Sequence, residues 1–111
     1  MESSHRPGEH AGIAKRIATA QRLIALAAKV ASREDFRFWQ SDRAHWVDLT
    51  IETLRDGGHL GTAAAFERTV RFPTGTGEWF EDLPEELALL RDGNSLLKEI
   101  LERDHPKAFT T

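Results

Sequence analysis

Apolar residues recur at helical spacing along the N-terminal third of the chain. From Ala11 onwards they follow one another at steps of three or four residues, which places them on one face of an α-helix. This apolar stripe consists of Ile13, Ile17, Ala20, Ile24, Ala27 and Ala31. Three basic side chains fall on the opposite side of the predicted helix, namely Lys15, Arg22 and Lys29.

A second long helix is predicted between clear start and stop signals. Ser32 and Asp35 form a Ser-x-x-Asp pattern that resembles a capping box, so the helix is expected to begin near Glu34. It runs to about Asp56 and stops at Gly57–Gly58, because glycine adopts the left-handed geometry of a C-terminal cap at little cost. Its inward stripe consists of Phe36, Trp39, Val47, Ile51 and Leu54.

Two apolar residues of this second helix, Trp46 and Leu49, lie off its inward stripe. They indicate either contact with a second neighbouring helix or a break near Ser41, which is an acceptable N-cap residue. Both alternatives stay open at the level of the sequence.

The middle of the chain mixes two periodicities. Residues 62–69 have the spacing of a short helix, whereas residues 69–72 alternate as a strand would, and we favour the helix. Residues 73–77 hold one proline and two glycines and therefore predict a turn or loop. A minor β-hairpin near 69–80 stays open, and it would pair Val70 and Phe72 with Trp79 and Phe80.

The last predicted helix carries leucines at heptad-like spacing, and Pro84 suits its first turn. These leucines are Leu83, Leu87, Leu90, Leu97 and Leu101. Asn94 occupies the same stripe, next to Gly93. Either the helix breaks there, or it continues and carries a buried asparagine of the kind that fixes register between packed helices. His105–Pro106 marks its end, because the residue before a proline avoids helical geometry.

These elements together predict an all-α helical bundle of about four helices. A chain of 111 residues has room for one domain, which we place at residues 11–111. Residues 1–10 have no apolar period and predict a disordered tail. The core is either complete within one chain or completed by dimerisation through the first or the last helix, so a homodimer is one expectation.

Composition and charge narrow the classes of function. The chain has no cysteine, so it has no disulfide and no cysteine nucleophile. The uncharged run at residues 23–28 ends at Lys29, too short for a membrane span or signal peptide, so we expect a cytoplasmic protein that does not bind membranes. The net charge of -3 is unevenly divided, because residues 1–33 are basic and residues 34–111 are acidic. An acidic chain makes nucleic acid an unlikely partner.

The histidines and the acidic residues carry the enzyme alternatives. No histidine pair has the spacing of metal ligands on adjacent helical turns, and no metal or cofactor is predicted. His45 lies between Asp42 and Asp48, which would suit a phosphoryl carrier. An acidic cluster, Glu78, Glu81, Asp82, Glu85 and Glu86, could in principle hold magnesium. A solvated helix start, favoured by the helix dipole, explains this cluster more simply.

A third alternative is a helix-turn-helix-like DNA-binding regulator that uses the segment from Gly57 to Phe72. The glycines and alanines of this segment resemble the first helix of such a motif. The residues that follow Phe72 are those of a loop and include acid, whereas a recognition helix presents basic and amide side chains to the bases.

The prediction we favour is a non-enzymatic protein-binding module, which would be an adaptor, a regulatory subunit or an inhibitor. Tryptophans are core residues by default, but Trp79 follows a glycine-rich stretch, and an aromatic side chain in a loop is typical of an interface anchor. The expected contact surfaces are the Thr74–Phe80 loop and the outer side of the first helix. The predicted partner-binding residues are Trp79, Phe80, Lys15, Arg22 and Lys29.

Overall fold

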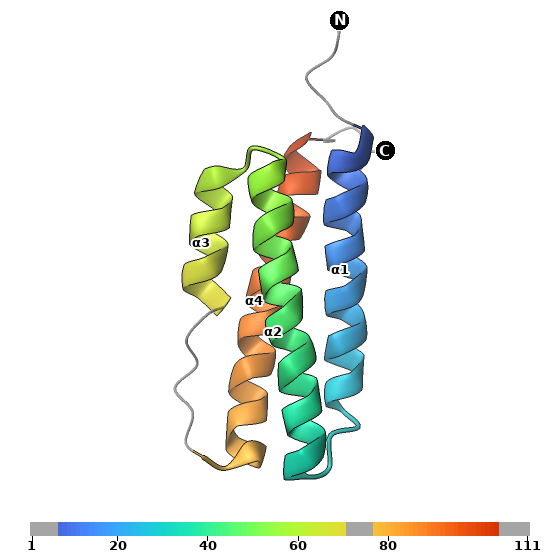
Figure 1. Cartoon of the computed structure of the whole chain (residues 1–111), viewed down its shortest axis with the longest axis vertical. Helices are drawn as coiled ribbons and strands as arrows, with labels where there is room; N and C mark the ends of the chain where they lie inside the picture. The colour runs from blue at the N-terminus through green and yellow to red at the C-terminus, as the bar shows by residue number, and fades with distance from the viewer. Residues whose placement is uncertain (1–6, 71–76, 105–111) are drawn as a thin grey trace, which may run out of the picture.

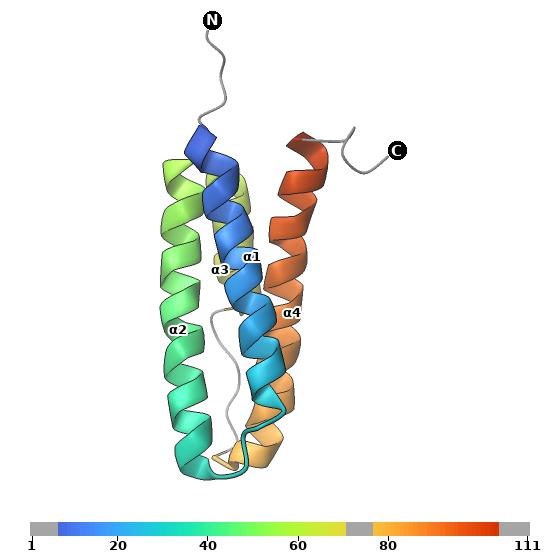
Figure 2. The same ribbon diagram turned by 90° about the vertical axis from the view of Figure 1, so that its right-hand side faces the viewer.

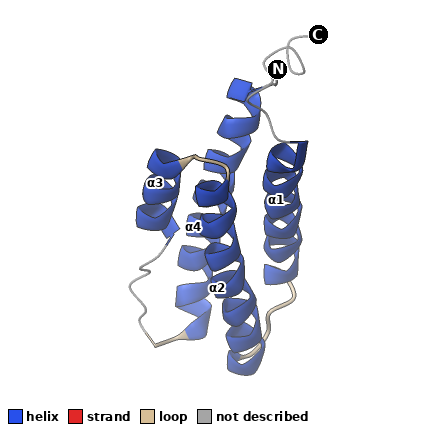
Figure 3. Ribbon diagram, turned by 45° about the horizontal axis from the view of Figure 1, so that its top comes forward, coloured by secondary structure: helices blue, strands red, loops and turns tan. Residues whose placement is uncertain are grey.

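Four helices make up the described part of the chain and run alternately up and down (Figure 1). The computed structural model describes residues 7–70 and 77–104. The helices are α1 (Pro7–Ala27), α2 (Arg33–Asp56), α3 (Leu60–Val70) and α4 (Trp79–Asp104). The predicted all-α bundle is therefore confirmed, and the described residues contain no strand (Figure 3). The alternative hairpin is wrong for its described members, because Val70 belongs to α3 while Trp79 and Phe80 belong to α4.

The helices form a ring in which each contacts its two neighbours, and α2 and α4 also contact each other across it. α1 packs against α2 and α4, and α3 packs against the same two helices from the other side (Figure 2). α3 has 11 residues and is about 16 Å long, whereas the 24 residues of α2 span about 36 Å. Figure 1 shows that α3 therefore lies beside only one half of α2 and α4.

The ends of α2 follow the predicted signals closely. The Ser32 hydroxyl accepts a hydrogen bond from the Asp35 backbone N–H at 3.1 Å, which confirms Ser32 as the N-cap. At the other end, Gly58 has a φ of 83°, and the His59 N–H donates to the Leu54 carbonyl at 2.8 Å. This bond closes a Schellman motif, so the left-handed glycine cap is also confirmed.

The structure resolves the two open alternatives along α2 and α4. α2 is continuous through Ser41, and Trp46 makes a second contact, because its ring meets Phe66 of α3 edge to face with centroids 5.3 Å apart. α4 is continuous through Gly93 and carries Asn94 buried in the core, as one of the two alternatives expected.

Two helix starts differ from the sequence-based expectation. α1 begins at Pro7 rather than at Ala11. α4 begins at Trp79, so the prediction that Pro84 lies in the first turn is wrong. The Glu78 carbonyl accepts hydrogen bonds from the backbone N–H groups of Glu81 and Asp82, both at 3.0 Å, and these bonds start the helix before the proline is reached.

Candidate protein-binding surfaces

A buried ion pair joins α2 to α4 at the level where α3 ends. The Arg43 side chain donates from Nε to Glu86 Oε1 at 2.9 Å, and the two residues are 6% and 1% exposed. Gln40 Nε2 donates to the second carboxylate oxygen of Glu86 at 2.6 Å. Arg43 Nη1 donates to the Val70 carbonyl at 3.2 Å. Both charges thus have partners with good geometry, which is the condition for keeping an ion pair in a core.

This cluster of Arg43, Glu86 and Gln40 connects three helices through hydrogen bonds. Val70 is the last residue of α3, and its carbonyl belongs to the negative end of that helix, where a cation is favourable. The cluster therefore caps α3 and ties it to α2 and α4. Each oxygen of the Glu86 carboxylate accepts one hydrogen bond from α2.

Trp79 and Phe80 lie in the first turn of α4 and not in a loop, which corrects the predicted extent of the Thr74–Phe80 loop. Residues 71–76 are outside the described part of the chain. Trp79 is half-buried and packs against the core, whereas Phe80 is 56% exposed. Their rings meet edge to face with centroids 5.9 Å apart. Trp79 thus packs against the core, whereas Phe80 faces solvent.

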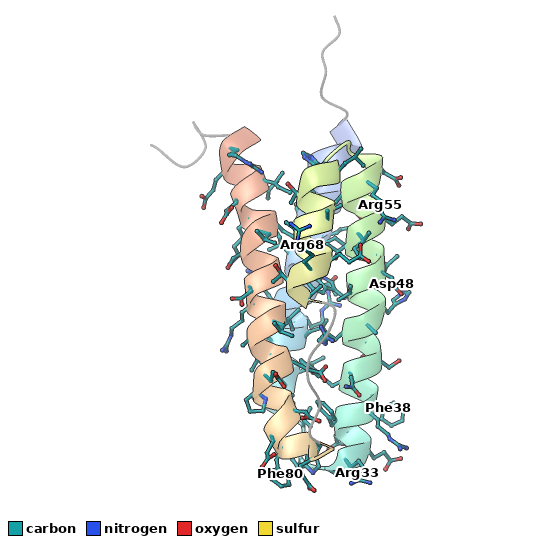
Figure 4. The ribbon with its side chains drawn as sticks, turned by 90° about the vertical axis from the view of Figure 1, so that its left-hand side faces the viewer. Arg33, Phe38, Asp48, Arg55, Arg68 and Phe80 are labelled. Atoms are coloured by element: carbon teal, nitrogen blue, oxygen red, sulfur yellow. The ribbon has the colours of Figure 1, made fainter. Side chains whose placement is uncertain are left out.

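A hollow of about 280 Å³ lies beside Trp79, between the beginnings of α2 and α4. Its lining residues are Arg33, Phe36, Arg37, Gln40, Gly77, Trp79 and Asp82. Arg33 and Arg37 are exposed, while Phe36 is buried. We call Phe80, Trp79, Arg33 and Arg37 the Phe80 surface. Figure 4 shows Phe80 and Arg33 at the same end of the bundle.

The three predicted basic residues lie elsewhere, along the outer side of α1 and the turn after it. Lys15, Arg22 and Lys29 are all exposed, as the helical spacing predicted. None of the three lines the hollow beside Trp79, so the structure divides the predicted binding residues between two surfaces. Lys29 instead lines a hollow of about 210 Å³ between α1 and α2.

This second hollow contains Phe38, an apolar residue that the sequence did not single out. Leu26 is 40% exposed and Phe38 is 67% exposed. The hollow is lined by Leu26, Lys29, Val30, Asp35, Phe38, Trp39 and Asp42. The available signal was the phase of Phe38, which lies outside the inward stripe that contains Phe36 and Trp39.

The residues of the enzyme alternatives do not form a site in the described part of the chain. His45 and its two neighbours, Asp42 and Asp48, are exposed on α2. Within residues 7–70 and 77–104, no group of three or more histidine or acidic side chains is placed to hold a metal ion.

The residues of the predicted acidic cluster differ in how deeply they are buried. Glu78 and Glu81 are exposed, as expected for a solvated helix start. That interpretation is wrong for Asp82 and Glu86, which are 7% and 1% exposed. Glu86 is the carboxylate that binds Arg43.

The segment of the DNA-binding alternative forms α3, and Phe72 lies outside the described residues. Ala63, Phe66 and Val70 of α3 are buried in the bundle. Considering residues 7–70 and 77–104, we find no helix with the length and apolarity needed to cross a membrane.

Comparisons with known proteins give no relative for this chain, because no family model, curated protein or solved structure matches it.

Proposed function

We propose that the protein is a non-enzymatic protein-binding module, acting as an adaptor, a regulatory subunit or an inhibitor, and that it binds its partner through the Phe80 surface. The observation that carries this proposal is the position of Phe80. Its ring is 56% exposed, yet it stands on the first turn of a 26-residue helix beside a tryptophan that packs on the core.

An exposed aromatic ring on a fixed support suits an interface anchor. Burying an aromatic side chain removes a large apolar area from water, and the Phe80 ring already meets Trp79 edge to face. Gln40 lines the hollow beside Trp79 and also donates to the buried Glu86, so the floor of the hollow is connected to the ion pair with Arg43. The surface is therefore preorganised on its core side.

The two arginines that line the hollow beside Trp79 define the kind of partner. Arg33 and Arg37 are exposed and line the hollow, and guanidinium groups bind carboxylates through paired hydrogen bonds. A complementary protein surface would place an apolar side chain against Phe80 and Trp79, with acidic residues opposite Arg33 and Arg37.

The proposal is tested by capture of partners from an extract of the native cell, followed by titration with the purified partner. Phe80→Asp is compared with Leu60→Asp, because Leu60 is 65% exposed but lies at the beginning of α3. We expect Phe80→Asp to weaken binding at least about 30-fold, which corresponds to an anchor residue worth about 2 kcal/mol.

Leu60→Asp is expected to bind like the wild type. The proposal is wrong if Phe80→Asp retains the partner with unchanged affinity, or if both variants lose it to the same extent. Circular dichroism of each variant checks that the bundle is folded before binding is measured.

A further inference from the structure

The side of α2 that lines the hollow beside Trp79 is the side that faces α3 further along the helix. Arg37 lines this hollow and lies 18 residues before Arg55, which is about five helical turns. Residues separated by five turns point in the same direction from the helix axis. Arg55 forms an ion pair with Glu67 of α3 at 3.6 Å, so this direction leads to α3 wherever α3 is present.

The hollow continues the space that α3 occupies between α2 and α4. α2 and α4 run in the same direction (Figure 1), and the ion pair of Arg43 with Glu86 joins residues 43 positions apart. Phe36 and Trp79 are also 43 positions apart and therefore lie at one level, and both line the hollow. Beyond the last residue of α3, the arginines of α2 and Trp79 of α4 thus line opposite sides of the hollow.

The two arginines of the hollow are not explained by contacts within the chain. Arg33 and Arg37 are exposed, and within residues 7–70 and 77–104 neither forms an ion pair. Arg33 also stands at the first residue of α2, where the positive end of the helix dipole is unfavourable for a cation. Stabilisation of the bundle therefore gives no reason for two guanidinium groups at this place, whereas a bound anion does.

We infer that the hollow binds an acidic, extended peptide segment of the partner, which lies in line with α3. The inference rests on the proposed function, because the hollow belongs to the Phe80 surface, and it names the chemistry of the bound segment. Carboxylates of the segment bind Arg33 and Arg37 as the Glu67 carboxylate binds Arg55.

The spacing of the two arginines matches an extended segment. Arg33 and Arg37 are four residues apart on a helix, which is about 6 Å along its axis. Alternate residues of an extended chain are about 6.6 Å apart, so two acidic residues at alternate positions meet both guanidinium groups. One turn of a helix about 10 Å wide fills roughly 420 Å³, more than the hollow of about 280 Å³ offers.

The two sides of the hollow determine which side chains alternate along the segment. Successive side chains of an extended chain point to opposite sides. When the acidic side chains point to α2, the residues between them point to Trp79 on α4. Apolar side chains are complementary there, because the Trp79 ring packs on the core and Phe36 beside it is buried. The bound segment therefore alternates acidic and apolar residues.

The acidic residues of the chain at this end leave the arginines accessible to the segment. Asp35 accepts a hydrogen bond from the Ala31 backbone N–H at 3.1 Å and lines the other hollow, beside Phe38. Asp82 is the acidic residue among those that line the hollow beside Trp79, and it is only 7% exposed. Its carboxylate thus belongs to the floor, below the exposed guanidinium groups.

Fluorescence anisotropy with labelled synthetic peptides tests the inference on the full chain. The probe is a peptide of about six residues in which aspartate and leucine alternate, because the ~20 Å of α2 beyond α3 correspond to about six extended residues. A blocked peptide has the same composition with all aspartates before all leucines. We expect the alternating peptide to bind at least about tenfold more tightly than the blocked peptide.

Exchanged charges test the role of the two arginines. Arg33→Glu combined with Arg37→Glu is expected to weaken binding of the alternating peptide at least about tenfold. The same variant is expected to bind a peptide with lysine in place of aspartate more tightly than the wild type does. Glutamate is favourable near the start of a helix, so the variant is expected to fold, and circular dichroism checks this.

Arg91→Glu combined with Lys98→Glu is the matched control, because it makes the same change of net charge at two exposed positions of α4 outside the hollow. It is expected to bind the alternating peptide like the wild type.

Four results would overturn the inference. The alternating peptide does not bind at concentrations up to about 1 mM, or the blocked peptide binds equally well. A peptide with phosphoserine in place of aspartate binds while the aspartate peptide does not, or the two charge variants bind the peptide alike.

The proposed function is tested separately by the native partner. If Phe80→Asp loses that partner while the Arg33 and Arg37 variant keeps it, the inference is wrong and the proposed function stands. If the alternating peptide binds as expected while Phe80→Asp keeps the partner, the inference stands and the anchor role of Phe80 is wrong.

Discussion

The two ends of the bundle differ in how completely their helices cover one another. At the end that contains α3, four helices share the interior, and Trp46 packs on Phe66. At the opposite end, which we call the turn end, α1 meets α2 through the turn between them and α4 begins (Figure 2). Of the four large apolar residues that are exposed among the described residues, Leu26, Phe38 and Phe80 lie toward the turn end. Exposed apolar surface is therefore concentrated at the end that α3 does not reach.

The Arg43 cluster marks the boundary between these two ends. It lies at the last residue of α3, whose carbonyl it binds. Beyond α3, the space between α2 and α4 is lined by polar side chains such as Gln40 and Asp82 as well as by aromatic ones. Polar and aromatic side chains thus line the space between α2 and α4 beyond the end of α3, and the Phe80 surface lies at that end.

Removing the charge of Arg43, which lies at this boundary, is expected to have the largest effect on stability. Arg43→Met removes the cation and leaves the Glu86 carboxylate, 1% exposed, with Gln40 as its remaining side-chain donor. An unpaired buried charge costs about 3–5 kcal/mol, which is a large part of the ~5–15 kcal/mol that stabilises a typical domain. Urea unfolding followed by circular dichroism measures the loss.

The double variant Arg43→Met with Glu86→Leu is the control for that experiment. It removes both charges and is expected to recover most of the lost stability, because an apolar pair of similar volume needs no partner. A single variant within about 1 kcal/mol of the wild type would show that the ion pair does not hold the boundary.

A smaller loss of stability is expected when a side chain is added at Gly93, where α4 packs against α3. A Cβ at this position would lie 2.7 Å from Val70 Cγ1 and 2.9 Å from Phe66 Cε1. Overpacking costs about 1–3 kcal/mol, and alanine returns up to about 1 kcal/mol through its higher helix propensity. We expect Gly93→Ala to lower the free energy of unfolding by about 1–2 kcal/mol in urea titrations.

Gly61→Ala is the matched substitution, since a Cβ there meets nothing within 4 Å and Gly61 is also helical. It is expected to be neutral or slightly stabilising. If the two alanine variants behave alike, the close approach of α3 to α4 does not limit the packing of that end.

The sequence predicted local features of the fold better than those that depend on how helices pair. Ser32 and Gly58 are local signals, because each satisfies backbone groups within a few residues of itself. The sequence left open whether the last helix breaks at Gly93. A glycine is needed there because Phe66 of another helix packs against that position, and no local pattern reveals this contact.

The candidate surfaces were predictable in part for the same reason. The exposure of Lys15 follows from helical phase alone. The exposure of Phe38 depends on which neighbour covers that side of α2, and no local pattern states this. Arg43 did carry a signal, because it stands one turn from Trp39 and Val47 on the inward stripe of α2, but its partner lies 43 residues away.

The smallest predicted effect concerns the one polar side chain that interrupts the inward stripe of α4 at the α3 end. Asn94 is 4% exposed, and its Oδ1 has no hydrogen-bond partner among the described residues. A buried acceptor without a donor costs about 1–3 kcal/mol, so replacing it by an apolar side chain of similar size removes that cost. We expect Asn94→Leu to raise the free energy of unfolding by about 1 kcal/mol, measured by urea titration. A loss of stability instead would mean that Asn94 has a partner in solution, and the α3 end would then be held by polar contacts as the boundary is.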